Sequence, residues 1–96
     1  MSEQQQQQQQ QQMQETMQLV ERFIALANEI KDEGKSVEMV NTALQLASGT
    51  YSTYLTAGNE GYLRETGIKK LTEVFKYNLT QIQKMKKAQH NPEGKD

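Results

Sequence analysis

The sequence predicts an all-α protein, a three-helix up-down-up bundle that assembles into a homodimeric helical bundle. Apolar residues recur at helical spacing in three segments of the 96-residue chain, the pattern of amphipathic helices. Short breaks that contain Gly34 and Gly58 separate these segments, and no stretch alternates polar and apolar residues as a half-buried strand does. Because short connections make neighbouring helices antiparallel, the second helix is expected to lie between the first and the third.

The chain opens with nine consecutive glutamines, Gln4 to Gln12. Such a polyglutamine tract cannot bury apolar surface to offset its ordering entropy. Residues 1–14 are therefore expected to be disordered or to form a frayed extension of the helix that follows, ahead of a helical domain over residues 15–89. Self-association through glutamine ladders is the functional alternative, and repeat slippage produces such tracts without any function.

The first helix is expected over residues 13–33. Its apolar residues form two neighbouring rows, namely Met13, Met17, Val20, Ile24 and Ala27, and Leu19, Phe23, Leu26 and Ile30. At about 100° per residue, the two rows cover nearly half of the circumference, which exceeds the apolar stripe of an ordinary surface helix. Lys31 suits the last turn and Gly34 is a natural stop. The excess apolar width predicts two neighbours for this helix.

The second helix is expected over residues 37–57, with Ser36 as N-cap and Glu38 in the first turn. Its apolar face is also wide, and residues 39–59 contain no charged side chain. A helix packed between two others has little solvated surface for charged side chains, which explains most of this uncharged run.

The remaining face of the second helix is small and neutral, with Gly49, Thr53 and Ala57 spaced by four. Rows of small side chains let another helix approach closely, and hydroxyl groups can bond to backbone carbonyls there. We expect this face to contact a second copy of the chain. A solvated Ser/Thr surface is the alternative.

The third helix is expected over residues 60–89, capped by Asn59 or starting later, at Gly67. Its core row is Ile68, Leu71, Phe75, Leu79 and Ile82. Pro92 marks the end of regular structure, so residues 90–96 are expected to form a flexible tail.

The predicted dimer is two-fold, with the first and second helices at the interface. The interface residues are Phe23, Ala27, Asn28, Ala47, Gly49, Tyr51, Thr53 and Tyr54. Asn28 interrupts the apolar pattern, and it either fixes the register of the interface, as a buried polar residue can, or bonds to solvent or a nearby turn. The function predicted is a self-associating protein–protein interaction module with an unidentified protein partner.

Catalytic and metal chemistry find little support in the sequence. The chain has no cysteine, and its one histidine, His90, lies at the predicted tail. Thiolate zinc sites and cysteine nucleophiles are therefore excluded, and no Ser/His/Asp arrangement or phosphate-binding glycine loop can be argued. We expect no enzyme activity, no cofactor and no metal site.

The alternative function is that of a nucleic-acid-binding accessory protein. Its surface would be the lysine face of the third helix, formed by Lys69, Lys76, Lys84 and Lys87. The net charge of the chain is −1, which provides no overall attraction to a polyanion. The uncharged run is too polar to cross a bilayer, so a cytoplasmic protein without membrane contact is expected.

Two stretches, VERFIALANEI at residues 20–30 and ALQLASGTYSTYLTAG at residues 43–58, carry a family resemblance. The first contains an F-I-x-L-A-N core, and the second belongs to a helix rich in alanine and aromatic residues. The chain resembles, over roughly residues 15–85, the small proteobacterial proteins of the domain of unknown function 3144 family. The resemblance implies a short all-helical bacterial protein with no known activity.

Overall fold

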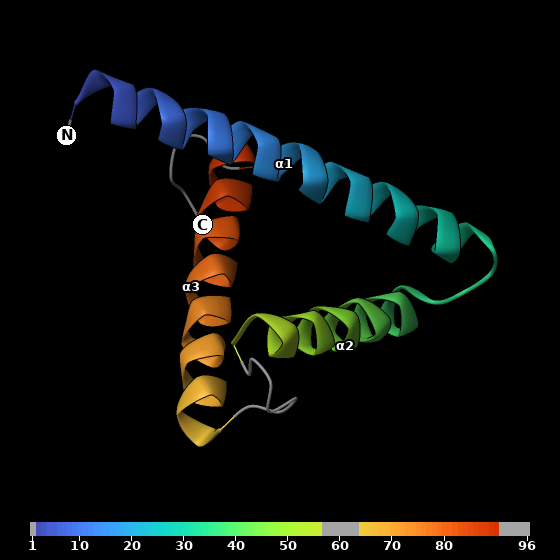
Figure 1. Cartoon of the computed structure of the whole chain (residues 1–96). Coiled ribbons are helices and arrows are strands. Elements are labelled where there is room, and N and C mark those ends of the chain that lie inside the picture. The colour runs from blue at the N-terminus through green and yellow to red at the C-terminus, as the bar shows by residue number, and fades with distance from the viewer. Residues whose placement is uncertain (1, 57–63, 91–96) are drawn as a thin grey trace. The chain divides into compact units, whose positions relative to one another are not determined.

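The computed structural model describes residues 2–56 and 64–90, and it contains three helices within them (Figure 1). These are α1 (Glu3–Asp32), α2 (Val37–Thr56) and α3 (Glu65–His90). No strand occurs among the described residues. The prediction of an all-α protein is confirmed.

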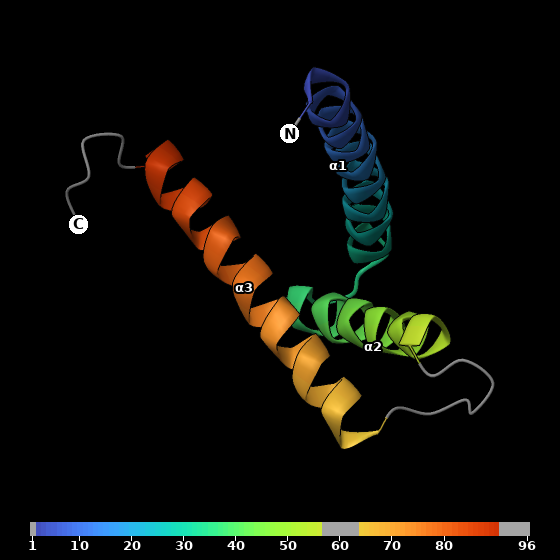
Figure 2. The same ribbon diagram turned by 60° about the vertical axis from the view of Figure 1, so that its left-hand side comes forward.

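α1 begins at Glu3, well before the expected start at residue 13. Ser2 caps this helix through a capping box, in which the Gln5 backbone N–H donates to Ser2 Oγ at 3.2 Å. The Ser2 N–H donates in return to Gln5 Oε1 at 3.4 Å. Because glutamine is a good helix former and the cap satisfies exposed N–H groups, the glutamine tract continues the helix. Figure 2 shows α1 as one uninterrupted helix from its blue N-terminal end, which holds the tract.

The turn after α1 follows the predicted chemistry. Gly34 adopts a φ of 103°, a left-handed conformation that glycine tolerates without strain. The Gly34 and Lys35 N–H groups both donate to the Lys31 carbonyl oxygen, at 2.9 and 3.2 Å. These bonds satisfy a carbonyl group that the end of the helix leaves without an intrahelical partner.

α2 begins where its cap predicts. The Met39 N–H donates to Ser36 Oγ at 3.1 Å, so Ser36 is the N-cap, and Glu38 lies in the first turn. The helix ends at Thr56. The last residue expected in it, 57, lies outside the described residues.

α3 begins at Glu65, two residues before the alternative start at Gly67. Asn59 and residues 60–63, where an earlier start was expected, lie outside the described part of the chain. The helix ends at His90, and the expected tail beyond it is also outside the described residues.

The chain divides into two units, residues 1–49 and 50–96. The first unit holds α1 and most of α2. The second unit holds the last turns of α2 together with the whole of α3. None of residues 2–55 and 64–90 is buried. Val40 and Leu71 are half-buried, and every other large apolar side chain of residues 2–55 and 64–90 is exposed.

Candidate interaction surface

The part of the predicted interface on α1 comprises Phe23, Ala27 and Asn28. The Phe23 side chain is 60% exposed, Ala27 is half-buried and Asn28 is exposed. Phe23 and Ala27 are four residues apart and therefore lie on one side of the helix. α1 thus presents an aromatic ring beside a small residue, a combination that another helix can pack against.

The small residues of α2 leave room for a close neighbour. A Cβ atom added at Gly49 would meet nothing within 4 Å, so the space beside this glycine is open. Ala47 is exposed and Thr53 is half-buried. The Thr53 hydroxyl donates to the Thr50 carbonyl oxygen at 2.7 Å, so it already has a hydrogen bond and an approaching helix would not leave it unsatisfied.

Tyr51 and Tyr54 are brought together by the three-residue spacing of α2. Their ring centroids are 6.0 Å apart and the rings are inclined by 74°, the edge-to-face geometry that aromatic quadrupoles favour. Both side chains remain largely exposed, Tyr51 at 75% and Tyr54 at 70%. The pair forms a pre-arranged aromatic patch, and tyrosine is enriched in protein interfaces because it combines a large apolar ring with a polar tip.

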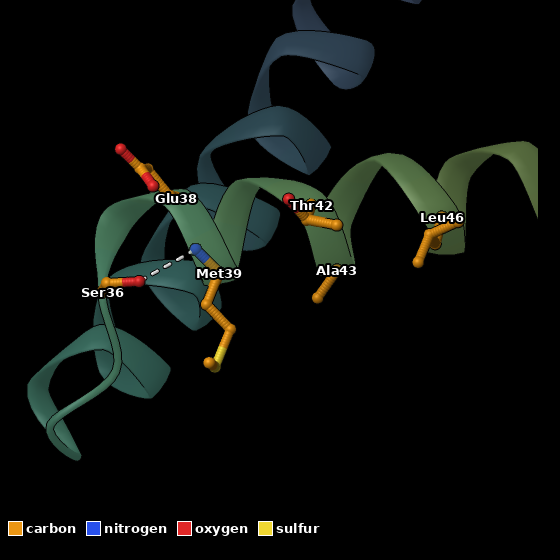
Figure 3. Close-up of a pocket in the computed structure, with 6 residues that line it drawn as sticks. All are labelled: Ser36, Glu38, Met39, Thr42, Ala43 and Leu46. Carbon is orange, nitrogen blue, oxygen red and sulfur yellow. Dashed lines mark hydrogen bonds between the residues drawn. The ribbon is translucent and has the colours of Figure 1, made fainter.

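An open hollow at the start of α2 was not among the predicted interface residues (Figure 3). Its volume is about 510 Å³, and it is lined by Ser36, Glu38, Met39, Thr42, Ala43 and Leu46. Figure 3 shows Met39, Ala43 and Leu46 projecting from the same side of α2, with Glu38 pointing elsewhere. The spacing of these three residues, i, i+4 and i+7, is the sequence signal that could have identified them.

Leu55 is a second site that the sequence reasoning did not select. Its side chain is 82% exposed, more than any other large apolar side chain of the described residues. An exposed leucine by itself is ordinary on protein surfaces. Tyr51, however, lies four residues before Leu55 and therefore on the same side of α2, so Leu55 enlarges the apolar surface at the end of this helix.

Residues 2–56 and 64–90 contain neither a cluster of metal ligands nor a membrane-spanning helix. No group of three or more histidine, cysteine or acidic residues there could hold a metal ion. No helix in the same ranges combines the length and the apolar character needed to cross a bilayer.

One of the comparisons with known proteins identifies a family. A family model described as "Protein of unknown function (DUF3144)" matches residues 16–89. The matched range begins just after the glutamine tract and extends over most of the three helices. The resemblance predicted from the two sequence stretches is confirmed. No curated protein and no solved structure was found to match the chain.

Proposed function

The chain belongs to the DUF3144 family of proteins of unknown function, and we propose that it acts as a self-associating protein–protein interaction module. The observation that supports this proposal is the exposure of apolar side chains along the three helices, because residues 2–55 and 64–90 include no buried residue. Monomeric proteins rarely expose contiguous apolar patches larger than a few hundred Å². Association would bury these side chains away from water. Burial of apolar surface is the dominant favourable term in most protein–protein contacts.

The associated state is, in this proposal, a two-fold homodimer in which each chain packs its helices up-down-up. A single domain of this size buries a smaller fraction of its surface than a larger domain does and is only marginally stable alone, so a second copy would complete the core. Phe23, Tyr51 and Tyr54 would supply apolar area at the interface. Gly49 and Thr53 would allow close approach of the neighbouring helix.

The role is proposed to be binding without covalent chemistry. A cysteine-free sequence suits a reducing bacterial cytoplasm, where we place the protein. A heterologous protein would then engage the apolar surface that the dimer leaves uncovered.

Solution mass across a concentration series tests the proposal directly. We expect light scattering of the full chain to reveal a stable mass near twice 11.0 kDa. Thr53→Glu should shift the mass toward the monomer, because it places a charge on a surface that association removes from water. Gln83→Glu, an exposed position of α3, is the matched control and should leave the mass unchanged. A monomer at every concentration would refute self-association.

Nucleic-acid binding through α3 is the competing function, and the charge of this helix favours it. α3 contains six lysines and only two acidic residues, Glu65 and Glu73. Its lysine face, Lys69, Lys76, Lys84 and Lys87, is exposed. Binding to RNA or DNA that weakens steeply with salt, and that is lost when these lysines are replaced by glutamine, would support this function instead.

A further inference from the structure

We propose that the partner of α1 is the α1 helix of a second copy, parallel and in register, and that the glutamine tract extends this contact. This inference rests on the proposed function, because it requires self-association. It specifies which helix forms the contact, the parallel direction of the two helices and a role for the glutamine tract. Five features of α1 support it, namely its heptad spacing, its length, the composition of the heptad-spaced row, the distribution of its charges and its apolar area.

A continuous heptad spacing runs from the tract into the apolar half of α1. We call this row the α1 seam, and it consists of Gln6, Gln10, Met13, Met17, Val20, Ile24 and Ala27. Its steps alternate between four and three residues without interruption, as the core positions of a two-stranded coiled coil do. Because the tract is helical and continuous with the rest of α1, Gln6 and Gln10 lie on the same side of the helix as Met13 and Met17.

The length of α1 leaves the tract beyond the reach of α2. α1 has 30 residues and α2 has 20, which correspond to about 45 Å and about 30 Å of helix. In an up-down-up bundle, an α2 that folds back from the turn at Gly34 would reach only to about the level of Met13. In the same bundle, α3 would start near the level of Met13 and run antiparallel to α2, away from the glutamine tract. A second copy is the partner that can lie beside the glutamines.

The composition of the α1 seam favours a parallel pair. In register, glutamine meets glutamine, and each amide offers both a donor and an acceptor to its counterpart. Antiparallel coiled-coil pairing would set Gln10 opposite Val20 or Ala27, leaving a polar group against apolar surface at a cost in free energy. A single polar core position can specify register and direction in this way.

The flanks of the α1 seam introduce no charge conflict. In a parallel pair, Phe23 lies opposite the partner's Asn28, and Glu21 lies opposite the partner's Thr16, so no like charges face each other across these flanks. Glu3 and Lys31 continue the spacing at the two helix ends. Both are exposed there, where solvent and salt screen the repulsion between like charges.

The apolar surface of α1 is sufficient for such a contact. Six large apolar side chains on the α1 seam or directly beside it are exposed, namely Met13, Met17, Val20, Phe23, Ile24 and Ile30. At about 100 Å² each they amount to about 600 Å², the lower end of the area that each partner covers in a specific interface. The predicted α1 interface residues lie on or beside the α1 seam. Ala27 is part of it, and Phe23 and Asn28 flank it on opposite sides.

Single-cysteine cross-linking tests the parallel register in the full chain, which contains no natural cysteine. Gln10→Cys on the α1 seam should oxidise to a disulfide-linked dimer, because facing core positions bring the two thiols within bonding reach. Gln8→Cys, on the outer side of the same helix, is the matched control and should remain largely unlinked. Equal linking of both variants, or no linking of Gln10→Cys in a protein that dimerises, would overturn the proposal.

Paired charge variants provide an independent readout of the same contact. Gln6→Glu with Gln10→Glu should weaken the dimer by about tenfold or more, because like charges then face each other across the α1 seam. Gln8→Glu with Gln11→Glu adds the same charge to the outer side and should change the dissociation constant by less than about twofold. Equal weakening of the dimer by the two double variants would refute a contact through the α1 seam.

The outcomes separate this inference from the proposed function. A protein that dimerises with unchanged affinity in the Gln6→Glu, Gln10→Glu variant retains the proposed function and loses the parallel α1 contact. A wild-type protein that is monomeric at every concentration loses both.

Discussion

α1 and α2 differ in how much of their helical structure is encoded by their own residues. α1 is built largely from glutamine, glutamate, leucine, methionine and alanine, which are good helix formers. α2 carries Gly49 and many serine, threonine, valine and tyrosine residues, which are intrinsically poorer. The difference teaches that α1 has strong local support, whereas α2 depends more on the surfaces packed against it.

The caps of the two helices reinforce the comparison. α1 starts with a reciprocal capping box at Ser2 and Gln5. Its first turns consist almost entirely of glutamines and contain no apolar residue. α2 starts with a single serine cap at Ser36, and two of the next three residues, Val37 and Met39, are apolar. Loss of the α2 cap therefore affects residues that can pack, whereas loss of the α1 cap affects the end of the tract.

The largest expected effect comes from placing a charge on α2. Ala47→Glu should weaken dimerisation by about 3 kcal/mol or more, because an interface would bury the carboxylate without a partner. If α2 instead remains solvated, Ala47→Glu should leave dimerisation unchanged and lower the free energy of unfolding by only about 0.5 kcal/mol, because glutamate is a slightly poorer helix former than alanine. Sedimentation equilibrium measures the dissociation constant, with Gln83→Glu as control. A dissociation constant equal to that of the wild type would remove Ala47 from the interface.

The next largest effect separates the two caps. Ser36→Ala should reduce the free energy of unfolding by about 1 kcal/mol, because it leaves an N–H group of the first turn of α2 without its acceptor. Ser2→Ala should have a smaller effect, since fraying would remove only glutamines from α1. Urea unfolding followed by circular dichroism compares the two variants. A larger loss for Ser2→Ala would show that the tract supports the folded state as a whole.

The smallest expected effect is that of Gly49→Ala, and its sign shows whether another helix packs beside this glycine. Gly49→Ala should stabilise α2 by up to about 1 kcal/mol if the open space beside Gly49 stays solvated, because alanine is the better helix former. If another helix occupies that space, the added methyl group should weaken the dimer instead. Thermal unfolding at several protein concentrations distinguishes the two cases, since only the dimer responds to concentration.

Local signals in the sequence accounted for much of the fold. Ser36 and Gly34 were recognisable because capping and left-handed turns depend on residues only a few positions apart. α1 begins at Glu3, earlier than the expected start at residue 13. Of the two alternatives for residues 1–14, disorder or an extension of the first helix, the helix propensity of glutamine and the cap at Ser2 favour the extension.

The candidate surface was only partly accessible to the same reasoning. Spacing placed Tyr51 and Tyr54 on neighbouring rows of α2 but could not establish the edge-to-face contact of their rings, which depends on side-chain rotamers. The hollow beside Met39 and Ala43 was present as a row of apolar residues. Nothing in its spacing distinguished it from the other apolar rows of the three helices.

The sequence by itself determined the all-α class, the turn at Gly34, the cap of α2 and the family to which the chain belongs. These features rest on short-range backbone chemistry and on residue patterns within single helices. Only the tertiary structure decided which apolar side chains remain exposed, that Tyr51 and Tyr54 meet, and that the space beside Gly49 is open. Exposure and contact depend on the positions of atoms in space, which spacing along one helix does not specify.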